Sequence, residues 1–354
     1  MTLNSLKPDE FIKKSENKLI IDVRSPIEYS KGHIPNSINI PLFSNEERKD
    51  IGTIYKTTGK KEAVLKGLLY VQPKLYSFVS QIYELTSKDQ DQEIFVYCHR
   101  GGLRSESFGW LLHTSSFKVT RLDSGYKGFR KFVLDTLGKK MKFILLNGKT
   151  GTGKTKILAE LAKKGEQVLD LEKLACHKGS AFGDLGQKKQ PSPQQFENNI
   201  FYKIINFNFE MPIWVENESP GIGNLFIPLE IRNNMKNAPL INIELPAKER
   251  INRIKKEYGQ FNQAFLEERI KKVQKKLGPE NLKKAIFHLY NNEIEETIKI
   301  LLTYYDKGYS YYMKKIDYHE NNSTINLEKD DPLKNAEIIL NFYSCKTSII
   351  GSSH

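Results

Sequence analysis

Cysteine is scarce in this sequence. Only three cysteines occur among 354 residues, Cys98, Cys176 and Cys345. Their wide spacing forms neither a disulfide framework nor a Cys-x-x-Cys metal pair, and this usage is typical of a reducing compartment. The first residues lack the apolar core of a secretion signal, and no apolar run approaches the length of a membrane span. We therefore expect a soluble, cytoplasmic protein with no membrane partner.

Internal repeats and long low-complexity segments are also missing, so the C-terminal part is expected to be folded and not a flexible linker. Acidic residues are in the minority, because 42 Asp and Glu against 55 Lys and Arg leave a net charge of +13. This excess favours an acidic partner, nucleic acid first. An equal alternative is that the lysines only keep the chain soluble.

The first part of the chain alternates between apolar runs and helix patterns. Short apolar runs predict buried parallel strands, and turn and helix signals such as Ser25-Pro26 lie between them. Such alternation is typical of an α/β domain, which we place at residues 1–138. The predicted strands are 19–23, 38–42, 94–97 and 119–122, and the predicted helices are 105–112 and 129–137, the second after a turn at 125–128.

A second α/β domain is predicted at residues 141–247. It begins with the order strand, glycine-rich loop, helix and strand, which is expected of a P-loop domain like those of nucleoside triphosphatases. From residue 248 the sequence changes to charged, helix-forming stretches, so we predict a helical, basic extension of this domain at 248–354. The strands predicted for this domain are 142–146, 168–171, 213–219 and 240–245.

A cysteine directly follows one strand of the first domain, in the run Cys98-His99-Arg100-Gly101-Gly102-Leu103-Arg104. A thiol between a strand and a helix receives positive potential from the helix N-terminus, which favours the reactive thiolate. Gly101 and Gly102 allow a tight curl of N–H groups around an anion. Cys98, Arg100 and Arg104 are therefore the predicted catalytic residues of chalcogen or phosphoryl transfer. The alternative is an inert, buried cysteine.

A glycine-rich loop, Gly148-Lys149-Thr150-Gly151-Thr152-Gly153-Lys154-Thr155, lies after a strand and before a helix. The N–H groups of such a loop surround phosphates, its lysine contacts their oxygens, and its threonine hydroxyl lies where Mg²⁺ would bind. ATP, GTP and other diphosphates present the same oxygens, so the loop leaves its ligand open. The predicted diphosphate-binding residues are Gly148, Gly151, Gly153, Lys154 and Thr155.

Two carboxylates end the strand predicted at 213–219. Glu216 and Glu218 alternate onto one strand face, where P-loop enzymes hold a metal ion or water. Solvated charges at a strand end are an equal alternative. Asp170 and Glu172 lie similarly around the end of another strand, with weaker support. We therefore assign a metal or catalytic role to Glu216 and Glu218 as a hypothesis and assign no definite metal site.

The predicted extension carries a strongly basic stretch. Residues 248–284 hold twelve Lys and Arg against five acids, which suits the phosphate backbone of an RNA. We interpret these residues as a contact surface and not as base-reading side chains. The residues assigned to it are Arg250, Arg253, Lys255, Lys256, Arg269, Lys271 and Lys272.

Residues 1–138 resemble a rhodanese domain, through residues 22–29, 32–37, 98–104 and 125–126. The stretch from Cys98 through Arg104 has seven residues, one more than the loop of typical rhodanese sulfurtransferases. A longer loop implies a wider nest, as in the related phosphatases. The resemblance therefore implies a transferred atom larger than sulfur, or a phosphorylated donor.

The chain as a whole closely resembles the tRNA 2-selenouridine synthase family, least clearly beyond about residue 320. The segments that carry this resemblance are 43–48, 52–56, 169–183, 190–198 and 215–219. The resemblance implies replacement of sulfur by selenium in the 2-thiouridine at the anticodon wobble position, with selenophosphate as donor. It also implies attachment of a geranyl group to that sulfur from geranyl diphosphate.

The resemblance assigns a task to each loop. The phosphate loop would bind the diphosphate of the prenyl donor, and Lys154 would stabilise the departing pyrophosphate. Cys98 would carry selenium as a perselenide or bind selenophosphate, and both alternatives stay open. The expected partners are tRNA and a supplier of selenophosphate. No tightly bound cofactor is implied, and Mg²⁺ is an optional ion at the phosphate loop.

Two other functions fit the same motifs. One is a cysteine phosphatase or sulfurtransferase domain fused to a nucleotide kinase, which the seven-residue loop from Cys98 to Arg104 allows. The other is a non-enzymatic protein that binds tRNA or relays sulfur and has a vestigial phosphate loop. Activity of the Lys154→Ala variant distinguishes a working phosphate loop from a vestigial one.

Overall fold

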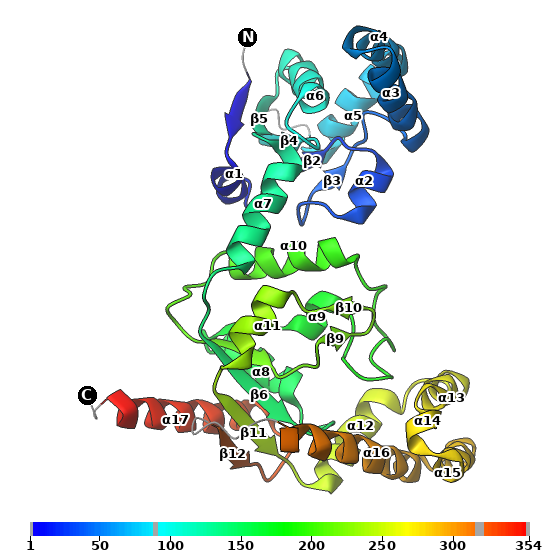
Figure 1. The fold of residues 1–354 in the computed structure, drawn as a ribbon, viewed down its shortest axis with the longest axis vertical. Coiled ribbons are helices and arrows are strands. Elements are labelled where there is room, and N and C mark those ends of the chain that lie inside the picture. The colour runs from blue at the N-terminus through cyan, green and yellow to red at the C-terminus, as the bar shows by residue number, and fades with distance from the viewer. Residues whose placement is uncertain (1–2, 88–90, 316–321, 352–354) are drawn as a thin grey trace. The chain divides into compact units, whose positions relative to one another are not determined.

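A computed structural model describes residues 3–87, 91–315 and 322–351 of the chain. The chain forms two compact units (Figure 1). The first unit comprises Met1–Gly138 and Ser192–Tyr202, and the second comprises Lys139–Pro191 and Lys203–His354. A segment of the second half of the sequence therefore belongs to the first unit, which differs from the predicted division at residues 138–141.

The first unit is built on a five-stranded parallel sheet, in the order β1-β5-β4-β2-β3. The central strand β4 has four consecutive buried residues, which is why its sequence is almost continuously apolar. Helices cover both faces of the sheet (Figure 1). The strands are β1 (Asn4–Leu6), β2 (Ile20–Asp22), β3 (Ile38–Asn39), β4 (Glu93–Tyr97) and β5 (Lys118–Leu122).

Local sequence signals explain several helix starts in this unit. At α3, the Ser44 side chain accepts a hydrogen bond from the Glu47 main chain, and the Glu47 carboxylate accepts one from the Ser44 main chain. The helices are α1 (Pro8–Lys14), α2 (Pro26–Lys31), α3 (Asn45–Thr57), α4 (Lys60–Val71), α5 (Leu75–Leu85), α6 (Leu103–Thr114), α7 (Gly125–Leu137) and α10 (Pro193–Ile204), with a short 3₁₀ turn at Gln72–Lys74. The turn predicted at 125–128 is the first turn of α7.

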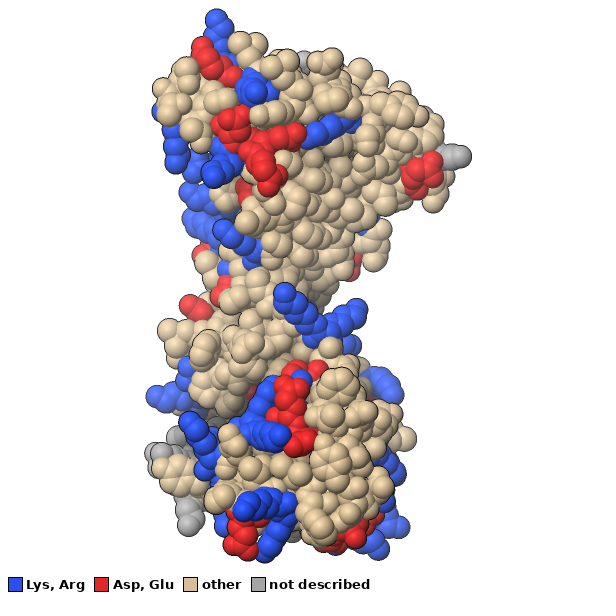
Figure 2. All heavy atoms as spheres, turned by 90° about the vertical axis from the view of Figure 1, so that its right-hand side faces the viewer, with Lys and Arg blue, Asp and Glu red and all other residues tan. Residues whose placement is uncertain are grey.

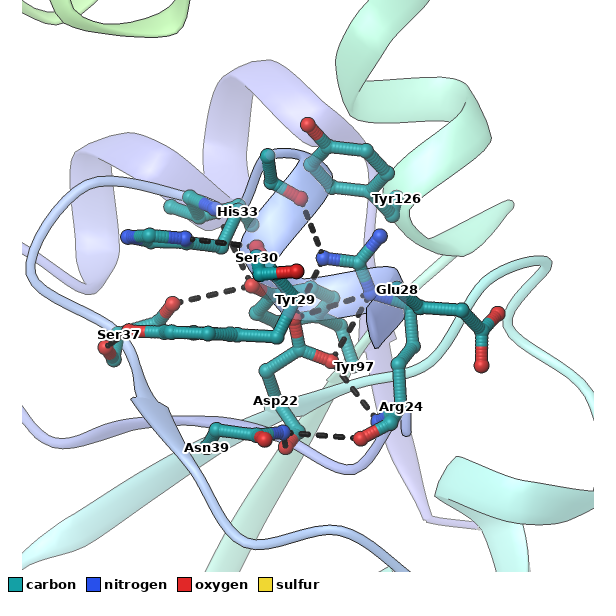
Figure 3. Close-up of polar contacts among 12 residues, drawn as sticks. Asp22, Arg24, Glu28, Tyr29, Ser30, His33, Ser37, Asn39, Tyr97 and Tyr126 are labelled. Atoms are coloured by element: carbon teal, nitrogen blue, oxygen red, sulfur yellow. Dashed lines mark hydrogen bonds and ion pairs between the residues drawn. The ribbon is translucent and has the colours of Figure 1, made fainter. Parts of the chain in front are cut away.

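A buried ion pair fixes the chain after β2 (Figure 3). Arg24 is 2% exposed, and its guanidinium donates to Asp22 at 2.6 Å and to the Gly32 carbonyl at 2.7 Å. The guanidinium also lies 3.8 Å from the ring centroid of Tyr126 in α7. Because a buried charge is tolerated only when its hydrogen bonds are satisfied, this pair ties β2, the turn at Gly32 and α7 together.

Helix α10 completes the first unit. Its Asn198 donates to the His33 carbonyl at 2.9 Å and to the Tyr126 hydroxyl at 2.8 Å, and its Phe201 packs edge-on against Phe129 of α7. From sequence alone this segment is predicted to belong to the second domain, because it follows the phosphate loop in the chain. Its buried amide and aromatic side chains, however, have their partners in residues 33–129.

The second unit contains a five-stranded parallel sheet in the order β12-β11-β6-β8-β7. Strand β6 lies in the middle and is buried along its whole length. The strands of this sheet are β6 (Phe143–Gly148), β7 (Gln167–Leu169), β8 (Ile213–Glu216), β11 (Leu240–Glu244) and β12 (Ser323–Asn326), and β9 (Gly221–Ile222) and β10 (Leu225–Phe226) form a separate antiparallel pair.

The region 248–354 was predicted to be a helical extension, but it also contributes a strand to the central sheet. Its strand β12 pairs with β11 as the edge of the central sheet, and Ala336 and Ile339 of α17 join the core formed by α8 and the sheet. Helices α12–α16 lie together (Figure 1), and their apolar side chains form a second core with Phe182 and Leu185. The helices of the unit are α8 (Lys154–Lys163), α9 (Leu171–Ala175), α11 (Leu229–Lys236), α12 (Ala247–Tyr258), α13 (Gln263–Lys272), α14 (Gln274–Leu277), α15 (Pro279–Tyr290), α16 (Ile294–Lys315) and α17 (Pro332–Gly351).

No helix within the described residues combines the length and the apolar character that crossing a membrane requires.

Candidate active sites

The cysteine loop lies between β4 and α6. Cys98 directly follows β4, and Gly102 is the N-cap of α6. The Ser105 hydroxyl donates to the Cys98 sulfur at 3.2 Å, and Gly101 adopts a positive φ of 69° that curls the loop. The helix N-terminus and the hydroxyl both favour negative charge near the sulfur. Cys98 is only 3% exposed, so whatever reacts there has to be small.

The first residues of α7 are hydrogen-bonded to the main chain of the cysteine loop. The main-chain N–H groups of Tyr126 and Lys127 donate to the carbonyls of Cys98 and His99 at 2.8 and 2.9 Å. Gly125 permits this approach, because a Cβ atom there would lie 2.4 Å from the Gly101 nitrogen and 2.5 Å from the Cys98 oxygen. A glycine read from the sequence as part of a turn therefore supports the cysteine loop directly.

The two predicted arginines of the loop differ in their surroundings. Arg104 lies in α6 and forms two hydrogen bonds with Glu28, at 2.7 and 3.2 Å. Burial would raise the pKa of Glu28, but the hydrogen bonds and charge of Arg104 outweigh it and lower that pKa to about 2. Arg100 is exposed, and no ion pair involves it in the part of the chain that the structure describes.

Arg48 of α3 is a cationic side chain near the cysteine that the sequence analysis did not assign. Its Nε lies 3.8 Å from the Glu28 carboxylate, and a thiolate at Cys98 would raise the pKa of Arg48. That pKa is lowered first by burial and then by the charge of Arg104. The signal for Arg48 was its place in segment 43–48, one of those that carry the family resemblance. It adds a third arginine around the cysteine loop.

The glycine-rich loop connects β6 to α8. Gly151 and Gly153 both have a φ of 85°, which favours glycine, and Gly153 is the N-cap of α8. The Lys154 ammonium lies 3.1 Å from the Gly148 carbonyl and 3.9 Å from the Glu216 carboxylate. The Thr155 hydroxyl donates to Glu172 at 3.3 Å. The structure thus places all five predicted diphosphate-binding residues between the end of β6 and the first turn of α8.

Three carboxylates converge beside this loop. One oxygen each from Glu172, Glu216 and Glu218 lies within 4.8 Å of the others. Glu216 is 4% exposed, and its Oε1 atom is buried without a hydrogen-bond partner within the described residues. Glu172, to which the sequence gave weaker support than to the other two, belongs to the cluster because α9 turns it back toward the loop. Asp170 instead caps α9 by accepting from the Lys173 main chain at 2.8 Å.

The electrostatics of this cluster indicate a missing positive charge. Burial raises the pKa of all three carboxyls. For Glu172 the charges of Glu216 and Glu218 raise it further, and Lys154 only partly opposes them. An orphaned carboxylate oxygen, a threonine hydroxyl and two further carboxylates are the oxygen ligands that Mg²⁺ prefers. The residues present therefore fit a divalent cation.

Two residues of the predicted RNA surface are not on the surface, so this part of the prediction is wrong. Arg250 is 4% exposed and binds the Asp306 carboxylate at 2.6 and 2.9 Å. Arg253 is 7% exposed and binds Asp330. The acids that pair with them lie 56 and 77 residues away in the sequence, so counting charges within 248–284 could not detect them. Arg250 also donates to the Thr150 carbonyl at 2.8 Å and so braces the phosphate loop.

The other residues of this predicted surface are exposed or half-buried. Lys255, Lys256, Lys271 and Lys272 are exposed, and within the described residues all of them except Lys256 form ion pairs with nearby acids. Arg269 is half-buried and pairs with Asp184 at 2.8 Å. On the face drawn in Figure 2, Lys and Arg side chains of the second unit lie beside Asp and Glu side chains in several places. Their role in RNA binding stays a prediction.

A cysteine loop at the end of a central parallel strand, followed by a parallel sheet with a phosphate loop, defines a rhodanese-like domain joined to a P-loop domain. Family models agree: residues 7–132 match the rhodanese-like domain, and residues 141–289 match the tRNA 2-selenouridine synthase AAA domain. Curated relatives include the tRNA 2-selenouridine synthases of Sulfurovum sp. (strain NBC37-1), 30% identical over 84% of this chain and 90% of the relative, and of Hydrogenovibrio crunogenus, 31% identical over 85% and 90%.

The chain belongs to the tRNA 2-selenouridine synthase family. Among solved structures, it is similar to the N-terminal domain of a putative ATP/GTP binding protein from Clostridium difficile 630. That similarity has 42% identity over 37% of this chain and 99% of that chain, with a TM-score of 0.34.

Proposed function

We propose that this protein replaces the sulfur of the wobble 2-thiouridine of tRNA with selenium, using selenophosphate as donor and geranyl diphosphate as an activating co-substrate. The observation that carries the proposal is the similarity to synthases of this name over 90% of their length. Two unlike anion sites support it, because one offers a sulfur beside arginines and the other a diphosphate-binding loop beside carboxylates.

The first step is prenyl transfer. The thiouridine sulfur attacks the carbon that carries the diphosphate oxygen, so that a C–S bond forms while the C–O bond breaks. Diphosphate leaves with the bonding electrons, and the uracil ring loses its N–H proton. Lys154 and the N-terminus of α8 stabilise the charge that develops on the leaving group. Thr155 and the three carboxylates would hold a Mg²⁺ ion, which supplies further positive charge when bound.

The second step is exchange of sulfur for selenium. The selenium of selenophosphate attacks the ring carbon that carries the geranylated sulfur, a C–Se bond forms, and the C–S bond breaks. Geranylthiol leaves after taking up a proton, and water then cleaves the Se–P bond to release phosphate. No oxidant or reductant is consumed. Alkylation is useful because a thiolate leaves more readily than sulfide.

Redox balance distinguishes the two roles that the sequence left open for Cys98. A perselenide on Cys98 would need an oxidant to form from selenophosphate, whose selenium is already at the selenide level, and a reductant to release its selenium. Direct binding of selenophosphate in the cysteine loop needs neither. A sulfur that is 3% exposed, next to the N-terminus of α6, suits a small anion better than a nucleobase. The cysteine loop therefore binds selenophosphate, which another enzyme has to supply.

The tRNA backbone binds to exposed lysines of the second unit. Lys255 and Lys256 of α12 and Lys271 and Lys272 of α13 are exposed and cationic. Lysine contacts to phosphate release counterions, so tRNA affinity should fall steeply with salt. Arg250 and Arg253 are excluded from this surface by their burial.

Nucleoside mass spectrometry with the intact protein tests the proposal. Thiolated tRNA is incubated with geranyl diphosphate, selenophosphate and Mg²⁺. Cys98→Ala should abolish selenation and leave geranylated nucleoside, whereas Lys154→Ala should lose geranylation first. Cys345→Ala and Lys156→Ala, at exposed positions, are the matched controls and should resemble the wild type.

Several outcomes would contradict the proposal. Equal loss of geranylation in the Cys98→Ala and Lys154→Ala variants would refute the division of tasks between the loops. Phosphate release from a phosphotyrosine analogue without tRNA would favour the phosphatase alternative. Cys98→Ser tests the role of the thiol, because a binding role allows partial selenation and a perselenide role allows none.

A further inference from the structure

An apolar pocket lies in the second unit among α12, α13, α15 and α16. Its walls include Phe182, Ile254 and Leu301. Taken over the described part of the chain, its lining contains no Asp, Glu, Lys, Arg or His. Tyr258 and Tyr305 add hydroxyl groups, and burial raises the pKa of both, to about 12 for Tyr305, so these groups stay neutral. The pocket therefore carries no charge at neutral pH.

One wall of this pocket belongs to the phosphate loop. Thr150 of the loop lines the pocket. At the next residue, a Cβ atom on Gly151 would lie 2.9 Å from Cδ1 of Ile254, another wall residue, so the loop packs directly on α12. The pocket is thus continuous with the loop that binds the diphosphate.

The pocket also adjoins the carboxylate cluster. A Cβ atom on Gly179 would lie 3.0 Å from Glu172 and 2.9 Å from Glu218, and the following residue, Ser180, lines the pocket. The charge of Glu172 contributes to the raised pKa of Tyr258. The segment 179–180 therefore lies between the carboxylate cluster on one side and the apolar pocket on the other.

We propose that this pocket binds the hydrocarbon chain of the prenyl diphosphate while the phosphate loop binds its diphosphate group. This inference rests on the proposed function. The cavity volume of about 70 Å³ is several times the ~10–15 Å³ that one water needs, so it suits a narrow chain. A nucleotide base would leave most of its polar edge atoms without partners among aliphatic side chains. An apolar chain instead gains roughly fourfold in affinity for each methylene that leaves water.

Calorimetric titration of the intact protein with Mg²⁺ tests this assignment, using geranyl diphosphate, inorganic pyrophosphate and ATP as probes. We expect the wild type to bind geranyl diphosphate at least about 100-fold more tightly than pyrophosphate. Leu301→Phe narrows the pocket and should weaken geranyl diphosphate roughly 10- to 100-fold while leaving pyrophosphate unchanged. Thr303→Phe, at an exposed position of the same helix, is the matched control and should change neither affinity.

A second variant guards against misfolding as the explanation. Leu301→Ala enlarges the pocket and should shift preference toward farnesyl diphosphate, whose chain has five more carbons. Unchanged pyrophosphate binding in both Leu301 variants shows that the second unit is folded. A gain for the longer chain cannot result from a damaged unit, so this outcome supports the pocket specifically.

Several results separate failure of the pocket from failure of the proposed function. Equal affinity of the wild type for geranyl diphosphate and pyrophosphate overturns the pocket. An equal loss of affinity for geranyl diphosphate and pyrophosphate in the Leu301→Phe variant also overturns it. The same holds if the wild type binds ATP more tightly than geranyl diphosphate and Leu301→Phe removes that preference. Geranyl transfer to tRNA that Leu301→Phe leaves unaffected also overturns it while the proposed function stands. Chain-dependent binding without any transfer to tRNA refutes the function and leaves the pocket assignment intact.

Discussion

Replacing Glu172 with glutamine should make the metal-free protein more stable at alkaline pH. The pKa of Glu172 is raised to about 9, first by burial and then by Glu216 and Glu218. Because the unfolded chain releases this proton near pH 4.5, folding retains a proton that the unfolded state has lost, and the free energy of unfolding falls as pH rises. Glutamine has no proton to lose, so the variant escapes this penalty.

The size of the effect follows from the pKa shifts. Each pKa unit corresponds to about 1.4 kcal/mol. Since the three carboxyls share their protons, we take the smaller shift, that of Glu218 from 4.5 to about 7, as the measure for the whole cluster and expect a gain of up to about 3 kcal/mol at pH 8. At pH 5 the folded wild type keeps the proton while the unfolded chain has lost only part of it, so the gain should fall below about 1 kcal/mol. For a unit of this size, the gain corresponds to a rise of roughly 2–10 °C in melting temperature.

Tryptophan fluorescence can follow the second unit alone. The chain has two tryptophans. Trp110 is exposed in α6, and Trp214 is fully buried in β8. In a Trp110→Phe background, thermal unfolding of the second unit is read from Trp214 at pH 5 and pH 8. Glu280→Gln, which changes an exposed carboxylate of the same unit, is the control and should show no gain that depends on pH.

Magnesium should reverse the order of stability. Binding at 1,000 times the dissociation constant stabilises the folded wild type by about 4.1 kcal/mol, whereas Glu172→Gln lacks one ligand and should gain less. The wild type should therefore become the more stable protein at pH 8 once Mg²⁺ is added. An equal effect of Glu172→Gln at pH 5 and pH 8, or a loss of stability at pH 8 without Mg²⁺, would refute the reasoning.

Three further predictions follow from the contacts. Gly125→Ala should destabilise the first unit by about 1–3 kcal/mol and abolish selenation while pyrophosphate binding persists, because its Cβ would lie 2.4 Å from a main-chain nitrogen of the cysteine loop; normal selenation would contradict this. Asp22→Asn should cost the first unit about 3–5 kcal/mol in thermal unfolding, because Arg24 keeps a buried, unpaired charge; an unchanged melting temperature would speak against it. Arg250→Met should lower the melting temperature of the second unit, whereas Lys256→Met should leave it unchanged and reduce the salt dependence of tRNA binding by about one ion; equal melting losses would contradict this difference.

Local patterns were sufficient for much of this fold. Strands β4 and β6 are almost continuously apolar because both faces of each strand are buried, so their sequences predict them directly. The phosphate loop is equally local, since its glycines, lysine and threonine lie within eight consecutive residues between β6 and α8. Strand β12 was missed because only one of its four residues is buried, as befits an edge strand.

Features that depend on distant partners were not predicted. In the sequence, Arg250 and Arg253 resemble exposed cations of an amphipathic helix. Their ion-pair partners lie in α16 and in the segment before α17. The sequence placed Glu172 at a strand end with weaker support than Glu216 and Glu218, because only the turn of α9 brings it to these carboxylates more than 40 residues further along the chain. Ion pairs between residues 56 and 77 positions apart cannot be predicted from a local sequence pattern.

The interleaving of the two units in the sequence constrains how the protein can mature on the ribosome. The first unit needs Ser192–Tyr202, so its assembly waits until β6 and β7 of the other unit have already emerged. The second unit waits longer still, because its edge strand ends at Asn326. At a synthesis rate of about 5–20 residues per second, the roughly 120 residues between these points take on the order of 6–25 s. Once β11 has been made, it has an unpaired edge until β12 follows, which makes this the stage at which a chaperone would matter most.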